Sequence, residues 1–255
     1  MDMPHYFYLL LAISLLWSCD DADPVQDTEN TDLTLSIQAF MGTQGPLELE
    51  SRTYNAPSVE EGFRVSRLSY YLSEIQLFQT TPNGQDLATD IGEIAYVNFS
   101  PDGTADVVFE NVPVGDYDRL GFRLGLTAEQ DETVPNDYAA DNPLGRDSEY
   151  WFDWGSYIFL KAEGRADTLV DNQARFDTPF TYHVGRSGTL GRDIRIDYPV
   201  TLSTSSAALA INFNAAQLLG LGEPDGVKLR GGLDHANMEA LPMMDRAATA
   251  FVKAP

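Results

Sequence analysis

Residues 194–202 read IRIDYPVTL, and every second position from Ile194 to Leu202 carries an apolar or aromatic side chain. Successive side chains of a β-strand point to opposite faces, so this period of two indicates a strand with one buried face. The same strict alternation runs through residues 120–126, LGFRLGL, and returns in shorter form at 33–37 and 209–213. These segments therefore predict a series of half-buried strands.

A longer apolar run from Phe63 to Gln79 alternates with slips of phase, which indicate a β-bulge. Turn-forming triplets punctuate the chain between apolar runs, namely PNG at 82–84, PDG at 101–103 and PVG at 113–115. Many short strands separated by such turns are typical of an antiparallel sandwich or barrel.

Helical sequence is confined to residues 215–221 and to a C-terminal tail from about Met238 to Val252. Pro242 would lie in the first turn of the tail helix, where proline is tolerated. The apolar face of that helix is predicted to consist of Met238, Leu241, Met244 and Phe251. The sequence thus predicts an all-β fold, an antiparallel β-sandwich with a short C-terminal helix and long loops.

The first 19 residues, MDMPHYFYLLLAISLLWSC, resemble a bacterial export signal. The apolar stretch from Tyr6 to Trp17 has the length of a signal's hydrophobic region and is too short to span a bilayer. It ends in LWSC, which resembles a lipobox, the motif whose cysteine is acylated. An ordinary signal peptide with an unpaired cysteine is the alternative. We therefore expect a lipoprotein signal at residues 1–18 and lipidation of Cys19.

Residues 19–32 are acidic and almost without large apolar side chains, so they predict a disordered tether that joins the lipidated cysteine to a domain at 33–255. Acyl chains anchor a protein by burying methylene groups, each contributing about 0.8 kcal/mol. The expected location is the cell envelope, anchored to the outer membrane and either periplasmic or surface-exposed. Membrane contact is expected only through Cys19.

The chain carries 39 acidic and 16 basic residues, a formal net charge of −23. Such a charge opposes binding to nucleic acid and to anionic lipid surfaces. It is compatible with metal cations, although the solubility of a secreted protein is a sufficient reason for it. Residues 129–149 form a long acidic loop whose carboxylates could hold calcium. Because the spacing of an EF-hand is absent, a solvated loop is the favoured interpretation.

Common catalytic signatures are absent from the sequence, including GxSxG, Walker A, GxGxxG and HExxH. The single cysteine excludes disulfides, thiolate zinc sites and a cysteine nucleophile in the domain. Carboxylates of the acidic loop could serve a hydrolase, but no nucleophile or metal motif accompanies them. We therefore expect a protein that is not an enzyme.

Two tryptophans, Trp151 and Trp154, lie in an aromatic segment at 150–164, YWFDWGSYIFLKAEG. His183 follows in a strand-like segment whose apolar neighbours occupy the opposite face. An imidazole is a common metal ligand and, beside an amine or thioether donor, suits copper. A hydrogen-bonded surface histidine is the simpler interpretation. His235 offers a second imidazole later in the chain.

Several segments recur in a characteristic order: RLSYYLSEIQL at 67–77, VPVGDY at 112–117 with FRLG at 122–125, Trp151 with YIFLKAEG at 157–164, and YHVG at 182–185. Together they resemble the MbnP-like family, which comprises methanobactin-associated periplasmic proteins and their surface lipoprotein relatives. The resemblance runs from about Leu33 to the C-terminus.

The resemblance implies an all-β fold, export, and copper binding through histidines and a tryptophan oxidised to kynurenine by a partner dihaem peroxidase. On this sequence the oxidised position corresponds to Trp151. The family's second tryptophan falls on Asp153, with Trp154 one place later. His183 matches a family histidine, and His235 lies where relatives often carry one.

The leading hypothesis is a lipoprotein that binds copper at His183, His235 and Trp151 without catalysis, with the dihaem peroxidase as the partner that oxidises Trp151. The alternative is a non-catalytic surface binding or structural module for a polysaccharide or a protein. The two differ in geometry, because one metal ion requires both imidazoles at about 2 Å from it.

Overall fold

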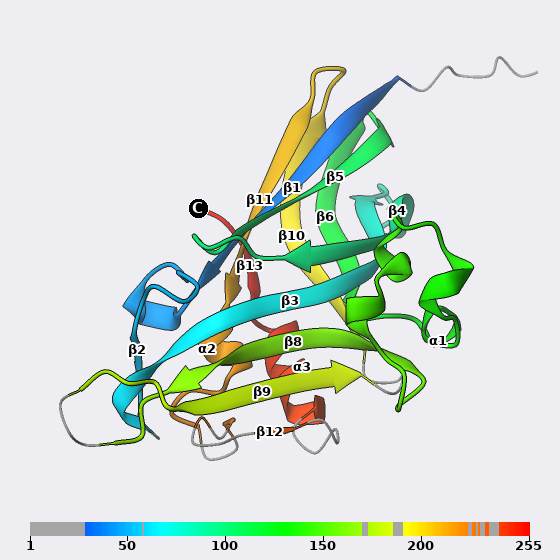
Figure 1. The fold of residues 1–255 in the computed structure, drawn as a ribbon. Coiled ribbons are helices and arrows are strands. Elements are labelled where there is room, and N and C mark those ends of the chain that lie inside the picture. Colours follow the sequence, from blue (N-terminus) through cyan, green and yellow to red (C-terminus); the bar gives the residue numbers. More distant parts are fainter. Residues whose placement is uncertain are drawn as a thin grey trace, which may run out of the picture.

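The alternating segments form two β-sheets that pack across one hydrophobic core (Figure 1). The structure is a computed structural model that describes residues 29–57, 59–169, 173–185, 191–223, 226–227, 229, 233–234 and 240–255. The prediction of an all-β sandwich with a short C-terminal helix is confirmed.

The smaller sheet has four strands in the order β13–β11–β1–β5. Their bounds are Phe251–Lys253 for β13, Ala207–Asn214 for β11, Asn30–Phe40 for β1 and Thr104–Pro113 for β5. β1 runs parallel to β11 and antiparallel to β5. Three inward side chains of β1 are at most 1% exposed, as the alternation predicts, and they are Leu33, Leu35 and Ile37.

The larger sheet follows the order β10–β6–β3–β8–β9–β12, while β2 and β4 also pair with β3, and β7 pairs with β8. In chain order these strands are β2 (Tyr54–Ala56), β3 (Val59–Thr80), β4 (Asp86–Asn98), β6 (Gly115–Leu124), β7 (Tyr150–Trp151), β8 (Ser156–Ala166), β9 (Thr178–Gly185), β10 (Arg192–Leu202) and β12 (Leu233–Asp234). Paired strands in this sheet are antiparallel except β9 and β12.

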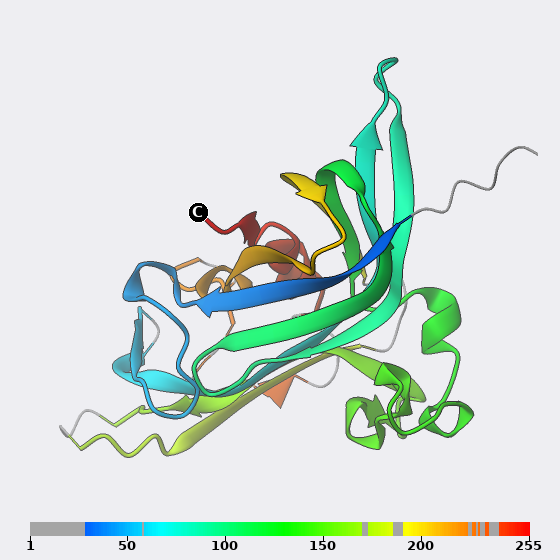
Figure 2. The same cartoon turned by 90° about the horizontal axis from the view of Figure 1, so that it is seen from above.

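The central strand β3 is 22 residues long and irregular. Its pairing with β8 shifts register between Val65 and Arg67, and its pairing with β4 shifts between Ile75 and Gln76. These shifts confirm the bulge that the phase slips predict. With β4 it forms a hairpin whose far end rises from the body of the molecule in Figure 2.

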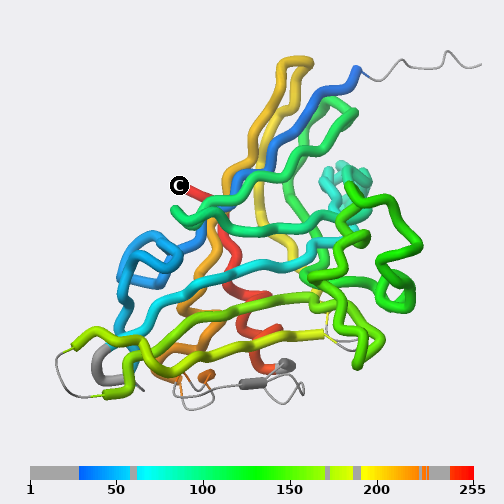
Figure 3. The backbone as a smooth tube through the Cα atoms, in the orientation of Figure 1, coloured from blue at the N-terminus to red at the C-terminus, as the bar shows by residue number. Residues whose placement is uncertain are grey.

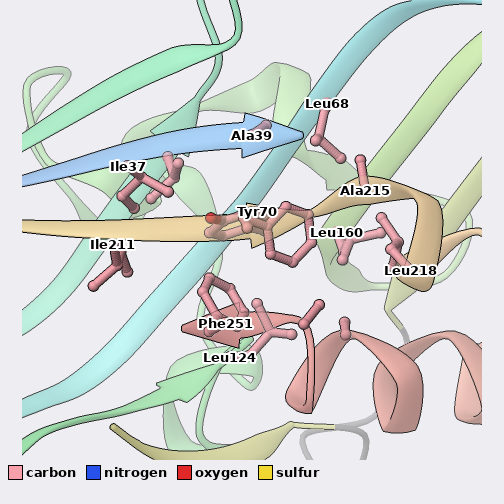
Figure 4. Close-up of a cluster of buried hydrophobic side chains, with 14 of the residues drawn as sticks. Ile37, Ala39, Leu68, Tyr70, Leu124, Leu160, Ile211, Ala215, Leu218 and Phe251 are labelled. Atoms are coloured by element: carbon pink, nitrogen blue, oxygen red, sulfur yellow. The ribbon is translucent and has the colours of Figure 1, made fainter. Parts of the chain in front are cut away.

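Aromatic rings from both sheets meet in the centre of the core (Figure 4). The ring of Tyr70 on β3 lies 5.3 Å from that of Phe213 on β11 and 5.7 Å from that of Phe251 on β13. The rings of Phe213 and Phe251 are 4.7 Å apart. Aromatic pairs at such distances add about 0.5–1.5 kcal/mol each beyond their burial, so this cluster holds the sheets together.

The C-terminal tail differs from its prediction. Helix α3 covers Ala240–Ala248, and the chain then enters β13, so a helix that reaches Val252 is wrong. Phe251 is not on a helical face. It pairs with Phe213 along the sheet edge, where its backbone gains strand hydrogen bonds and its ring joins the core.

The predicted helix at 215–221 and the predicted packing of the C-terminal methionines agree in part with the structure. Helix α2 covers Ala215–Leu218 and is shorter than the predicted 215–221. Met243 and Met244 of α3 are fully buried in the core, which agrees with a packing role for the C-terminal methionines. Met238 lies outside the described residues.

Residues 127–155, green in Figure 3, pack on the outer face of the larger sheet. They contain short helical turns rather than one structureless loop: α1 (Ala128–Asp131), η2 (Pro135–Asp137), η3 (Pro143–Gly145) and η4 (Asp147–Glu149). A second hydrophobic cluster, here called the outer cluster, forms beneath them from Tyr71, Leu126, Leu144, Tyr157 and Phe159. The predicted solvated loop is therefore a folded layer with an exposed acidic surface.

The structure bears on the N-terminal predictions only at the boundary between the predicted tether and the domain. The expected signal at residues 1–18 and Cys19 lie outside the described residues. β1 begins at Asn30, where it already pairs with β5, so residues 30–32 belong to the domain and not to the tether. Across the described ranges, no helix combines the length and apolar character that crossing a bilayer requires.

Candidate functional site

His183 lies on the outer face of the larger sheet. On β9 its neighbours Tyr182 and Val184 point into the core and are each 2% exposed, as the strand alternation predicts. In the register of the sheet, His183 is directly opposite Lys161 of β8. The imidazole is therefore presented on a rigid, hydrogen-bonded surface, on the same face that residues 127–155 cover.

The two tryptophans sit on a short hairpin, formed by β7 and the start of β8, which we call the Trp hairpin. Tyr150 pairs with Tyr157 and Trp151 with Ser156, and Gly155 closes the turn with a φ of +63°. The indoles of Trp151 and Trp154 stack with centroids 4.7 Å apart and planes inclined by 12°. They stack on each other, because a tight turn brings residues three apart to one side.

The fold brings the Trp hairpin onto the strand that carries His183. The ring centroids of Trp151 and His183 are 5.7 Å apart, with the planes at 68°, so the rings meet edge to face. Two of the three predicted metal-site residues are thus adjacent, although 32 positions separate them in sequence. His235 lies outside the described residues; β12 ends one residue earlier, where Asp234 is paired with Tyr182.

Glu163 is a site residue that sequence reasoning missed. The Nε2 atom of His183 lies 2.6 Å from Oε1 of Glu163, a short hydrogen bond in which the imidazole N–H donates. This hydrogen bond lowers the pKa of the Glu163 carboxyl below its ordinary value. The Nε2 atom is therefore engaged by a protein carboxylate, which fixes the orientation of the imidazole.

An open hollow of about 330 Å³ is lined by residues of the Trp hairpin and of the sheet. Its lining consists of Ser148, Tyr150, Trp151, Phe152, Asp153, Ile158, Lys161 and His183. Among the residues that the structure describes, no three His, Cys, Asp or Glu side chains converge as a metal site would require. The described lining therefore offers one imidazole and the carboxylate of Asp153, and a complete copper site needs a further donor.

A buried ionic cluster underlies the hollow and was also missed. Glu149, the last residue of η4, is 1% exposed and forms ion pairs with Arg67 at 2.6 Å and Lys161 at 2.9 Å. The sequence did carry a signal, because Lys161 and Glu163 alternate with apolar residues in a segment too apolar to be an exposed strand. Their pairing partners could not be read from it.

The acidic-loop carboxylates that could hold calcium serve other contacts where they are buried. Asp131 accepts hydrogen bonds from the Ser156 hydroxyl at 2.8 Å and the Tyr157 amide at 3.1 Å, which attach α1 to the start of β8. Burial raises the pKa of the Asp131 carboxyl above its ordinary value. Glu149 is held in the ionic cluster, and several other acids of this layer are exposed.

Comparison with known proteins gives the chain a family. The family model described as MbnP matches residues 30–238. Among solved structures, MbnP from Methylosinus trichosporium is similar with a TM-score of 0.45 and 10% identity, covering 76% of this chain and 79% of that chain. A search of curated proteins found no match. Since the family model spans most of the chain, including every strand from β1 to β12, the protein belongs to the MbnP family.

Proposed function

We propose that this protein is a non-enzymatic copper-binding lipoprotein of the cell envelope, with copper held at His183, His235 and Trp151. The observation that carries the proposal is the edge-to-face contact of Trp151 with His183 at the mouth of a hollow on a rigid sheet. Sequence spacing did not require this contact. The two rings come from separate strands, β7 and β9, and both line a hollow that is open to solvent.

The donor chemistry supports copper more than calcium. Imidazole nitrogen suits copper and zinc, whereas calcium takes hard oxygen ligands in larger numbers. Glu163 acts on His183 as carboxylates commonly act on metal-bound histidines, by fixing the orientation of the ring. The indole nitrogen is a poor donor, since its lone pair belongs to the ring. Oxidation of Trp151 to kynurenine would supply an aromatic amine at the same position.

The remaining parts of the proposal follow the sequence. Lipidation of Cys19 would anchor the protein to the outer membrane through a tether, and a partner dihaem peroxidase would oxidise Trp151. The net charge of −23 favours the approach of a cation. The 127–155 layer carries exposed carboxylates close in sequence to the residues that line the hollow. One of these acids, Asp153, lines the hollow itself.

Copper titration tests the proposal. Protein carrying Cys19→Ser, which removes the only thiol, should take up about one copper ion per chain. His183→Ala should weaken the affinity about 100-fold, which corresponds to about 2.7 kcal/mol, and His235→Ala should weaken it similarly. Competition with a chromophoric chelator, for Cu(I) and Cu(II) separately, measures these constants.

A charge control distinguishes coordination from general attraction of cations. Asp141→Asn removes one exposed carboxylate of the same layer and should leave the affinity within about twofold, as expected for a screened surface charge. The proposal fails if wild type, His183→Ala and Asp141→Asn all bind copper equally weakly. That result would favour a surface module for a polysaccharide or protein ligand.

Oxidation of Trp151 is tested in the native host. Intact mass of the purified protein should show a small, defined increase, and peptide mapping should place it at residue 151. Trp151→Phe should abolish the increase, whereas Trp154→Phe should keep it. An unmodified mass at both tryptophans would remove kynurenine from the proposal and leave the two imidazoles as the donors to be tested.

A further inference from the structure

The buried ionic cluster of Glu149, Arg67 and Lys161 lies next to the start of the Trp hairpin, since Glu149 immediately precedes β7. The Glu149 carboxylate receives Arg67 from β3 and Lys161 from β8. The Ser148 hydroxyl also donates to it at 3.1 Å, and the Ser148 carbonyl accepts from the Lys161 ammonium at 2.5 Å. Side chains from β3 and β8 therefore bind Ser148 and Glu149, the two residues that immediately precede β7.

Stability alone does not account for such a cluster. Removing a carboxylate and an ammonium from water costs several kcal/mol per ion, and apolar side chains of similar volume often serve equally well. The outer cluster offers an apolar surface close by, because Tyr96, which packs against that cluster, accepts a hydrogen bond from Arg67 at 3.1 Å. Charged groups add direction, because a carboxylate held by two cations on neighbouring strands is confined to one position.

The Trp hairpin has a short backbone anchor. β7 comprises two residues, and it pairs with β8 only through Tyr150 and Trp151. The turn that follows is directed to solvent, with Phe152 67% exposed. Two residues of β-pairing are marginal by themselves, so the position of the Trp151 indole depends on what holds the preceding residues.

We infer that Arg67 and Lys161 are positioning residues that act through Glu149 to hold Trp151 against His183. The inference rests on the proposed function, since it identifies what aligns one copper-site side chain with another. The alignment itself exists without metal. The Glu163–His183 hydrogen bond orients the imidazole, and the charges of Arg67 and Lys161 also act on Glu163.

Near-ultraviolet circular dichroism reports whether the stacked indoles of the Trp hairpin are held in one fixed environment. The chain has three tryptophans, of which Trp17 lies in the predicted signal. In protein carrying Trp17→Phe, every indole signal comes from the stacked pair, whether or not the leader is removed. Glu149→Gln and Lys161→Met should abolish most of this signal while the far-ultraviolet spectrum keeps its β-sheet form. Copper affinity should fall about tenfold, the low end of the effect of losing a supporting residue around a metal site.

Matched variants separate positioning from general damage. Glu48→Gln makes the same change in an exposed pair with Arg52 and should alter neither measurement. Arg67 is 35% exposed, so Arg67→Met is expected to fold even if Glu149→Gln does not. It should lose the indole signal, and Arg67→Lys should restore most of it.

The outcomes distinguish this inference from the copper proposal. An unchanged indole signal and unchanged copper affinity in folded Arg67→Met and Lys161→Met would overturn it. Loss of the indole signal in these variants, when wild type itself binds no copper, would uphold the positioning role and remove the proposed function. Equal loss in Glu48→Gln would show a general effect of charge and would also overturn the inference.

Discussion

Phe213→Ala should lower the free energy of unfolding by about 3–5 kcal/mol, the usual cost of deleting a buried phenylalanine ring. Phe213 is fully buried, and its ring contacts those of Tyr70, Phe99 and Phe251. Tyr70 and Phe251 lie on strands of different sheets and Phe99 directly follows β4, so the cavity left by the substitution cannot collapse by the movement of one element. The loss combines burial, aromatic contacts and residual cavity.

Chemical denaturation monitored by far-ultraviolet circular dichroism measures this loss. For a domain of this size, each kcal/mol corresponds to about 2–4 °C in Tm, so a thermal scan should also show it. Phe152→Ala is the matched control, because the same atoms are removed from a ring that is 67% exposed. That variant should lose no more than about 1.5 kcal/mol, the upper value for a contact such as that of its ring with Tyr150. Equal stability of the two variants would contradict the proposed core.

Gly164→Val should destabilise the protein by about 3 kcal/mol or more, through overpacking instead of loss of contacts. Gly164 lies on β8 between β3 and β9. A Cβ atom built there would collide with the backbone carbonyl of Arg64 and with the ring of Phe180. Relief would require strands to separate on one side or the other, which breaks ladder hydrogen bonds.

The measurement is again the free energy of unfolding, with soluble yield as a second reading. Ala88→Val adds a branched side chain at an exposed position of β4 and serves as the control. It should change stability by no more than about 0.5 kcal/mol. If Gly164→Val is as stable as Ala88→Val, the close approach of β3 to β8 is wrong.

Several features of the site were readable from the sequence. Alternation around His183 predicted which face of β9 carries the imidazole, because side-chain direction in a strand follows from parity alone. The resemblance singled out Trp151 and His183 before any geometry was known, and the structure places their rings in contact. Phase slips in the long apolar run of β3 predicted its bulges, because an inserted residue shifts the alternation of buried and exposed positions.

Other features escaped prediction for identifiable reasons. The C-terminal tail has helical periodicity, yet Phe251 joins a sheet, because the edge of β11 offers both hydrogen bonds and a place in the core. The sequence of residues 129–149 predicts a solvated acidic loop, because its apolar residues are scattered and become buried only against the outer cluster. Glu149 is one of many acidic residues in its segment, and its neighbours in sequence do not indicate that it is buried.

The sequence by itself determined the class of fold, the inward faces of the strands and the face on which His183 lies. Each of these depends on periodicity, which is a local property of the chain. Only the tertiary structure decided that Trp151 meets His183, that Glu163 engages its Nε2 atom and that Arg67 and Lys161 enclose Glu149. Those contacts join residues on different strands, so they depend on strand order and register, which the whole hydrophobic core selects together.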